Sequence, residues 1–145
     1  MKSLVSVVLL SLVAVSVCYG HCQIPCGIYD DGMRFTLLLE HVETIDKSIT
    51  EAKRLSEAEV PDYNQLVRWI VNKEHHATEI QEIASDYFLA QRIKEGGEHY
   101  GESLELLHGI IVYAMKTKQS LDESNVVELE KKILEFQELY MEHEH

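Results

Sequence analysis

Apolar residues recur at steps of three and four positions through most of this chain, with acidic and basic residues between them. Between about residues 33 and 56 the apolar positions are Phe35, Leu38, Leu39, Val42, Ile45, Ile49, Ala52 and Leu55. Such spacing places apolar side chains on one face of an amphipathic helix. After Pro61-Asp62 a second stripe runs to about Gln91 and consists of Leu66, Ile70, Ala77, Ile80, Ile83 and Tyr87. The pattern therefore predicts two long helices.

Two further helices follow the Gly96-Gly97 pair, which interrupts the second stripe. The third helix, at about 98–118, carries Leu104, Leu107, Ile111 and Ala114. Ser120 and Glu123 have the spacing of a capping box and predict the start of a fourth helix, lined by Val126, Leu129, Ile133, Phe136 and Tyr140. The short connections favour antiparallel neighbours. We therefore expect an all-α fold, an antiparallel up-down-up-down four-helix bundle over residues 33–143.

The composition fits one ordinary globular domain. The chain has 145 residues, of which 46% are hydrophobic and 26% charged. Only two prolines and seven glycines are present, which disfavours an all-β fold with many tight turns. The formal net charge of −12 excludes a nucleic-acid-binding surface, because nothing in the chain could neutralise a run of phosphates.

Residues 1–20 are predicted to be a cleaved secretory signal peptide. Lys2 supplies a positive charge, and the apolar stretch at 4–17 is too short to be a convincing membrane span. Small residues at Cys18 and Gly20 suit a signal peptidase that cuts after Gly20. A lipoprotein acylated at Cys18 is disfavoured, because Val17 is bulkier than the residue that usually precedes such a site.

Cleavage between Gly20 and His21 would leave residues 21–145 as a secreted or lumenal chain that begins at His21. This chain would carry a formal charge of −13, because the removed segment holds one lysine and no acidic residue. We expect it to have no membrane segment. Two of the three cysteines, Cys22 and Cys26, would remain close to the new N-terminus.

Several pairs of candidate metal ligands elsewhere in the chain are weak evidence for a metal site. Glu105 and His108 have the Glu-x-x-His spacing of di-iron bundles. Their only possible partners, Glu142 and His145, lie at the frayed chain end, and no pair of core-facing glutamates is evident, so a di-iron centre is disfavoured. His75-His76 and the tail at 142–145 are predicted to be solvated polar faces. Phosphate-binding loops, nucleophile elbows and paired CxxC zinc ligands are absent from the sequence.

The predicted new N-terminus offers a different donor set and reads His-Cys-Gln-Ile-Pro-Cys-Gly-Ile-Tyr-Asp at 21–30. The amine of His21, the amide nitrogen of Cys22 and the Cys22 thiolate are successive chelate donors, and the Cys26 thiolate can fold back to close a square. Two nitrogens and two sulfurs in a plane suit nickel(II) or copper(II) better than tetrahedral zinc. The imidazole of His21 can then approach axially. Pro25 restricts the backbone between the sulfurs, and Gly27 permits a sharp exit.

This segment resembles the nickel hook of nickel superoxide dismutase, whose motif HCxxPCGxYD matches His21 to Asp30 without a gap. A second block, Asn64 to Glu74 followed by Ser85-Asp86-Tyr87-Phe88, is similar to the second helix of that family. The resemblance extends over residues 21–145. It implies one domain with the hook at 21–29 and the bundle at 33–143, one nickel ion per subunit and assembly into a homohexamer.

The resemblance also implies roles for individual residues. His21 would bind nickel through its amine and, in the oxidised state, its imidazole; Cys22 through its amide nitrogen and sulfur; and Cys26 through its sulfur. Tyr29 and Tyr87 would flank the open face and restrict the approach of an anion, and Asp86 would help to hold the hook against the bundle. The Ile24–Pro25 peptide would be cis.

The resemblance implies disproportionation of superoxide to dioxygen and hydrogen peroxide by cycling between nickel(II) and nickel(III). Two departures from the family pattern stand out. Gln23 stands where some members of the family have an acidic residue. In the family a carboxylate orients the axial imidazole, and this sequence has no clear counterpart of it; the nearest carboxylate in the sequence is Glu40.

The competing interpretation is a secreted, non-enzymatic helical bundle that binds a partner protein and carries a Cys22–Cys26 disulfide. So small a disulfide loop would constrain the unfolded chain only weakly. This interpretation explains neither the histidine directly after the predicted cut nor the Pro-Cys-Gly-x-Tyr-Asp run. The enzyme is therefore the favoured hypothesis.

Overall fold

The computed structural model of the chain describes residue 23 and residues 25–142. Within these residues the regular elements are helical: α2 (Asp31–Ser56), α3 (Tyr63–Glu82), the π-helical η1 (Ile83–Arg92), α4 (Tyr100–Gln119) and α5 (Ser124–Met141). The predicted signal peptide, His21, Cys22 and the Ile24–Pro25 peptide bond involve residues outside the described part. In the described part, no helix is long and apolar enough to cross a membrane.

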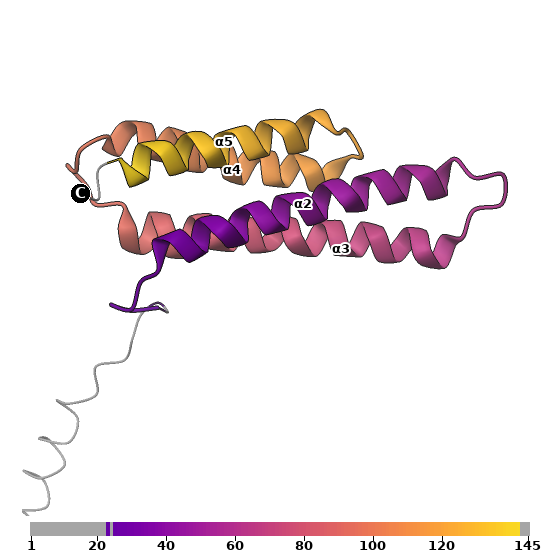
Figure 1. Ribbon diagram of the computed structural model, residues 1–145, viewed down its shortest axis with the longest axis horizontal. Coiled ribbons are helices and arrows are strands. Elements are labelled where there is room, and N and C mark those ends of the chain that lie inside the picture. Colours follow the sequence, from indigo (N-terminus) through magenta and orange to yellow (C-terminus); the bar gives the residue numbers. More distant parts are fainter. Residues whose placement is uncertain (1–22, 24, 143–145) are drawn as a thin grey trace, which may run out of the picture.

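The four long helices form the predicted up-down-up-down bundle (Figure 1). Helix α2 packs against α3 and α5, and α4 packs against the same two helices. Segment η1 continues α3 and also contacts α4. The start of α2, the end of η1 and the C-terminal end of α5 therefore meet at one end of the bundle (Figure 1). That end also carries the described part of the predicted hook.

Most of the predicted apolar stripes form the buried core. It includes Phe35, Leu38, Val42, Ile45, Ile49, Ala77, Ile80, Leu107, Ala114, Val126, Leu129, Ile133 and Phe136. The prediction was wrong for Ile70, which is 36% exposed, and Leu66 is only half-buried. Among the described residues 63–72, none is buried, so the first half of α3 presents its apolar side chains to solvent in the single chain.

The second predicted helix is not uniform, because its last ten residues form η1. The wider turn closes at its end where the Ile93 amide donates to the Phe88 carbonyl, five residues back, at 2.9 Å. Short π-helical segments occur frequently at functional sites. Here the segment contains Asp86 and Tyr87, two of the predicted site residues.

The predicted capping box at the start of the last helix does not form. Helix α5 begins only at Ser124, and its N-cap, Glu123, makes no capping hydrogen bond through its side chain. The Glu123 carboxylate pairs instead with Lys53 at 2.8 Å. The Ser120 hydroxyl accepts hydrogen bonds from the Asp122 amide and the Asn125 side chain, both at 3.3 Å, within the connecting turn.

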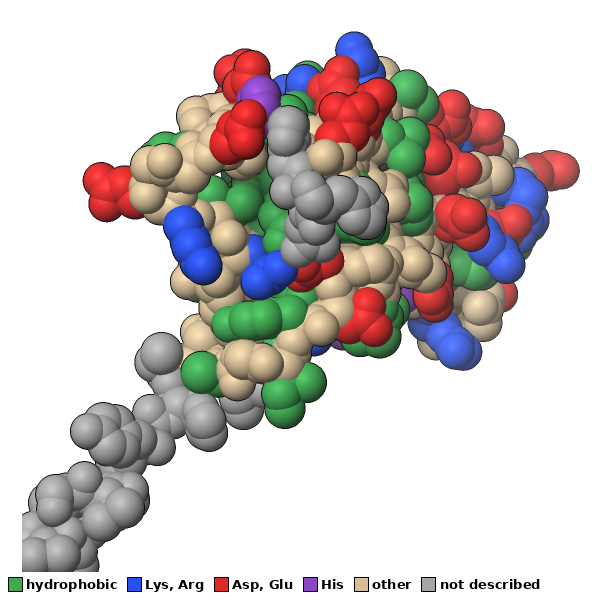
Figure 2. All heavy atoms as spheres, turned by 60° about the vertical axis from the view of Figure 1, so that its left-hand side comes forward, with side chains coloured by type: hydrophobic (Ala, Val, Ile, Leu, Met, Phe, Trp, Pro, Cys, Tyr) green, Lys and Arg blue, Asp and Glu red, His purple; other side chains and the backbone are tan. Residues whose placement is uncertain are grey.

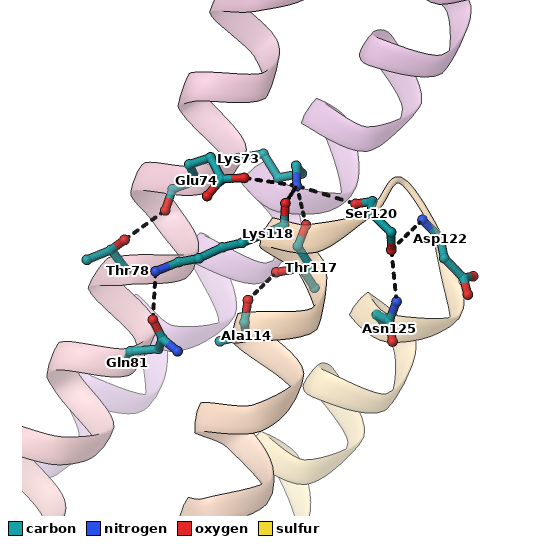
Figure 3. Close-up of polar contacts among 10 residues, drawn as sticks. All are labelled: Lys73, Glu74, Thr78, Gln81, Ala114, Thr117, Lys118, Ser120, Asp122 and Asn125. Carbon is teal, nitrogen blue, oxygen red and sulfur yellow. Dashed lines mark hydrogen bonds and ion pairs between the residues drawn. The ribbon is translucent and has the colours of Figure 1, made fainter.

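A buried lysine ties α3 to the C-terminal end of α4 (Figure 3). The Lys73 side chain is 3% exposed, and its ammonium donates hydrogen bonds to the carbonyls of Thr117, Lys118 at 2.8 Å and Ser120 at 3.3 Å. These carbonyls lie where a helix leaves acceptors without intrahelical partners and carries partial negative charge. Burial lowers the pKa of Lys73, and the adjacent Glu74 opposes this shift.

We expect Lys73→Met to destabilise the bundle, because it removes the donor and leaves these carbonyls unpaired. Hydrogen bonds to a charged group contribute about 1.5–3 kcal/mol, so a loss of that size is expected in urea unfolding followed by circular dichroism. Lys131→Met is the control, because Lys131 is 58% exposed and makes one ion pair, at 3.9 Å. Equal denaturation midpoints for the two variants would contradict this role.

Candidate functional site

The described part of the hook, residue 23 and residues 25–30, lies at the end of the bundle where α2 begins (Figure 1). Gly27 has a φ of +81°, a backbone conformation that favours glycine, as predicted for a sharp exit. Cys26 is exposed. Cys26 is thus the one predicted nickel ligand among the described residues, since His21 and Cys22 lie outside them.

Asp30 fixes the junction between the hook and the bundle. Its carboxylate accepts a hydrogen bond from the Met33 amide at 2.9 Å, which makes it the N-cap of α2. Because of this cap, α2 begins at Asp31, two residues earlier than its apolar stripe predicts. Asp30, the last residue of the motif, therefore marks both the end of the hook and the start of α2.

The two predicted site tyrosines lie together. The ring centroids of Tyr29, from the hook, and Tyr87, from η1, are 5.9 Å apart and meet edge to face at 79°. The Arg92 guanidinium lies 4.5 Å from the centroid of the Tyr29 ring, and that of Arg34 lies 4.8 Å from the Tyr87 ring. Each tyrosine is therefore held by a cation–π contact as well as by its neighbour.

A buried carboxylate that the sequence analysis missed organises this end of the bundle. Asp31 is 8% exposed and accepts hydrogen bonds from the Tyr87 hydroxyl, the Arg92 Nε at 3.0 Å and the Tyr140 hydroxyl at 3.0 Å. Its partners come from η1 and α5, whereas Asp31 itself is the first residue of α2. The only signal in the sequence was a second aspartate directly after the hook motif.

The same contacts set the ionisation of the site. Burial, together with the hydrogen bond to the Asp31 carboxylate, raises the pKa of Tyr87 to about 12. The hydrogen bond to Asp31 also raises the pKa of Arg92. At neutral pH Tyr87 is therefore a neutral phenol and Arg92 a cation, so Tyr87 adds no negative charge to the site.

A cavity of about 210 Å³ lies beneath the hook. Its walls include Gln23 and Pro25 from the hook and the side chains of Arg34, Glu79, Glu82, Asp86 and Tyr87 from the bundle. Asp86 thus lines the same cavity as Gln23 and Pro25, while it accepts hydrogen bonds from Ser85 and Gln91 within η1. Glu40, the carboxylate nearest in the sequence, is exposed and is not part of these walls.

The cavity contains a polar group that is not satisfied by the described residues. The Nε of Arg34 is buried and has no hydrogen-bond partner. A buried donor without an acceptor costs about 1–3 kcal/mol. The walls are also acidic, with three carboxylates and one guanidinium. An acidic cavity with one unused donor fits a hook that brings N–H groups and carbonyls, rather than the approach of an anion from this side.

The remaining candidate ligands are not assembled. Glu105 and His108 are both exposed on α4, so the di-iron motif does not face the core. His75 is exposed as predicted, whereas His76 is half-buried, which the sequence analysis did not expect. Among residues 23 and 25–142, no group of three or more histidine, cysteine, aspartate or glutamate side chains is arranged to hold a metal ion.

One family comparison covers nearly the whole chain. The sequence model of the family of nickel-containing superoxide dismutases matches residues 16–144. The match includes the hook motif and every described helix. Comparisons with curated proteins and with solved structures gave no match.

We expect Asp31→Asn to lower the pKa of Tyr87 from about 12 toward its ordinary value of 10, because it removes the negative charge beside the phenol. In the parent protein, stability should fall as the pH rises above 10, because the unfolded chain's tyrosine ionises before the folded one. The variant should lose less stability over that interval. Titration of the Tyr87 ring by carbon-13 NMR measures the pKa, and an unchanged value would contradict the assignment.

Proposed function

Because the chain belongs to the family of nickel-containing superoxide dismutases, and is therefore an oxidoreductase with a nickel cofactor, we propose that it binds nickel through His21, Cys22 and Cys26. The observation that carries this proposal is the arrangement at the end of the bundle. The positive φ of Gly27, the Asp30 cap and the paired tyrosines shape and fix the segment that bears these ligands.

The proposed reaction uses two superoxide ions. One is oxidised to dioxygen by loss of an electron, and the other gains an electron and two protons to become hydrogen peroxide. Nickel bound by two thiolates and a deprotonated amide supplies the one-electron chemistry by alternating between its divalent and trivalent states. The chain's residues hold the ligands and control access to them.

The tyrosines and arginines control that access in our proposal. Superoxide is an anion, and the predicted chain from His21 onward has a net charge of −13. Acidic side chains are spread over the face shown in Figure 2, with basic side chains between them. Because Tyr87 stays neutral and Arg92 lies over the Tyr29 ring, the tyrosine face repels an anion less than the surrounding surface does.

We further propose that residues 1–20 direct secretion and are removed before the enzyme becomes active. The family match begins at residue 16, so most of the predicted signal lies outside it. The amine of His21 exists only after cleavage, since in the precursor this nitrogen belongs to a planar amide. The alternative of a non-enzymatic bundle with a Cys22–Cys26 disulfide has no support from the family match.

The proposed assembly is the homohexamer implied by the resemblance. The first half of α3 exposes apolar side chains, with Tyr63 70%, Val67 56% and Val71 59% exposed. Val67 and Val71 are four residues apart and share one face of the helix. A contiguous apolar face of this kind is typical of protein interfaces. We propose that it contacts another subunit.

Cys22→Ser or Cys26→Ser should abolish dismutation and the binding of nickel at the hook, because each removes a thiolate, while leaving the helix content nearly unchanged. His21→Ala keeps a terminal amine, so it should still bind nickel(II) but turn over much more slowly. His108→Ala is the control, since this exposed histidine lies on α4. Metal analysis, superoxide decay and circular dichroism measure the three properties. Wild-type turnover in either serine variant would refute the proposed ligand set.

One extra residue before His21 should prevent dismutation and the binding of nickel at the hook, because it converts the amine into an amide. A cleavable tag that leaves His21 first should restore both properties. Intact mass, nickel content and superoxide decay of the two proteins test this expectation. If the extended protein were as active as the one that begins at His21, the amine could not be a ligand.

Val67→Glu combined with Val71→Glu should shift the protein to smaller species, because the charges cannot be buried in an apolar contact. Val127→Glu is the control, since Val127 on α5 is exposed to the same 59% as Val71. Sedimentation velocity measures the assembly state. A nickel-loaded, active wild-type monomer would overturn the proposed hexamer.

A further inference from the structure

Two histidines meet across the interface of α2 and α3. The Nδ1 atoms of His41 and His76 are 2.8 Å apart, and the ring centroids are 5.0 Å apart. Both residues are half-buried, so they are held by the helices yet open to solvent. Neither residue belongs to the tyrosine cluster or to the walls of the hook cavity.

Both imidazoles are suited to bind a metal ion, because they favour the neutral form. Burial lowers the pKa of His41, and the charge of His76 lowers it further. Burial likewise lowers the pKa of His76, followed by the charge of His75. Glu79 and Glu40 oppose these shifts. At neutral pH the pair therefore shares one hydrogen bond between uncharged rings, and neutral imidazole is the form that coordinates metals.

We propose that His41 and His76, with the Glu79 carboxylate, form a second metal site for a borderline divalent cation such as Zn²⁺ or Ni²⁺. Bonds of about 2.0–2.1 Å from one ion to two imidazoles place the nitrogens roughly 2.9–3.4 Å apart for angles between square and tetrahedral. The observed separation of 2.8 Å lies close to this range. On binding, the ring that donates from Nδ1 shifts its proton to Nε2 through solvent, and small ring rotations then direct both Nδ1 lone pairs at one point.

Glu79 is the third ligand because of its place on α3. It follows His76 by three residues, so the two side chains lie on the same side of the helix. Its carboxylate is half-buried and now lies 3.7 Å from the Nδ1 of exposed His75. As the described side chains stand, no third ligand is in place. Binding therefore turns Glu79 from His75 toward the metal, and water completes the coordination.

This site differs chemically from the hook. Its donors are two imidazoles and a carboxylate with no thiolate, so nickel bound there stays divalent and is not redox-active in the way proposed for the hook. A metal at this position links α2 to α3 and stabilises the bundle. Glu79 also lines the hook cavity, so the site lies beside the catalytic end of the molecule.

The test uses the chain from His21 onward with Cys22→Ser and Cys26→Ser, so that the hook thiolates are absent and the result is independent of the proposed dismutase site. Calorimetric titration with ZnCl₂ and with NiCl₂ at pH 7.5 should find one site per chain. Adding His41→Gln or His76→Gln should abolish that site, and Glu79→Gln should weaken it by about tenfold or more. His108→Ala should have no effect.

A second measurement keeps the proposal testable if a glutamine variant fails to fold. On addition of Zn²⁺ to the two-serine protein, the Nδ1 resonances of His41 and His76 should shift in nitrogen-15 NMR, while those of His75 and His108 should not. Binding that persists in both glutamine variants, or shifts confined to other histidines, would show that surface or tail histidines bind the ion. Either result would overturn the proposed site, as would the absence of binding.

Discussion

The buried carboxylate of Asp31 is the constraint on which the hook end of the bundle depends. A charge with so little exposure is tolerated only when it is paired and hydrogen-bonded. Asp31 meets this requirement by joining Arg92 and Tyr87 of η1 to Tyr140 of α5. Two separate segments, η1 and the end of α5, are thereby fixed relative to the first residue of α2. The hook, which has almost no core of its own, is attached to that residue through Asp30 and Tyr29.

The π-helical segment η1 has the same role as Asp31, because it also fixes the end of the bundle that carries the hook. A continued α-helix would place Asp86, Tyr87 and Arg92 at other angles around the helix axis, whereas the wider turn lets this short segment supply several contacts. Tyr87 reaches Asp31 and the Tyr29 ring, Asp86 lines the hook cavity, and Arg92 covers Tyr29. The irregular geometry of η1 is thus balanced by interactions at the site, as is common for π-helical segments.

The helices could be predicted from the sequence because core packing repeats with the helical period. The stripe from Phe35 to Leu55, apart from half-buried Leu39, and the one from Val126 to Phe136 are buried as expected. The predictions fail at positions where an interaction other than core packing determines the local structure. Ile70 faces solvent because the bundle does not cover the first half of α3, and Ser120 joins a turn network instead of a capping box. The hydrophobic periodicity of the sequence gives no sign of the π-helical segment η1.

The site was predictable only in part, for a related reason. The donor set of the hook motif can be recognised from residue type and spacing, whereas the roles of Tyr29 and Tyr87 followed only from the resemblance to the family. The Asp31 network and the His41–His76 pair join residues 35 to 109 positions apart, so only the fold brings them together.

The short tether between the hook and Asp31 explains how a terminal segment can be a precise site. Cys26 precedes Asp31 by five residues, a span of at most about 17 Å when extended. Tyr29 shortens the free part further, because its ring is held by Tyr87 and Arg92 only two residues before the anchor. Gly27 then turns the chain, and Gln23 and Pro25 lie on the cavity wall beside Arg34. The bundle therefore restricts the position of Cys26, the member of the predicted ligand set that the structure describes.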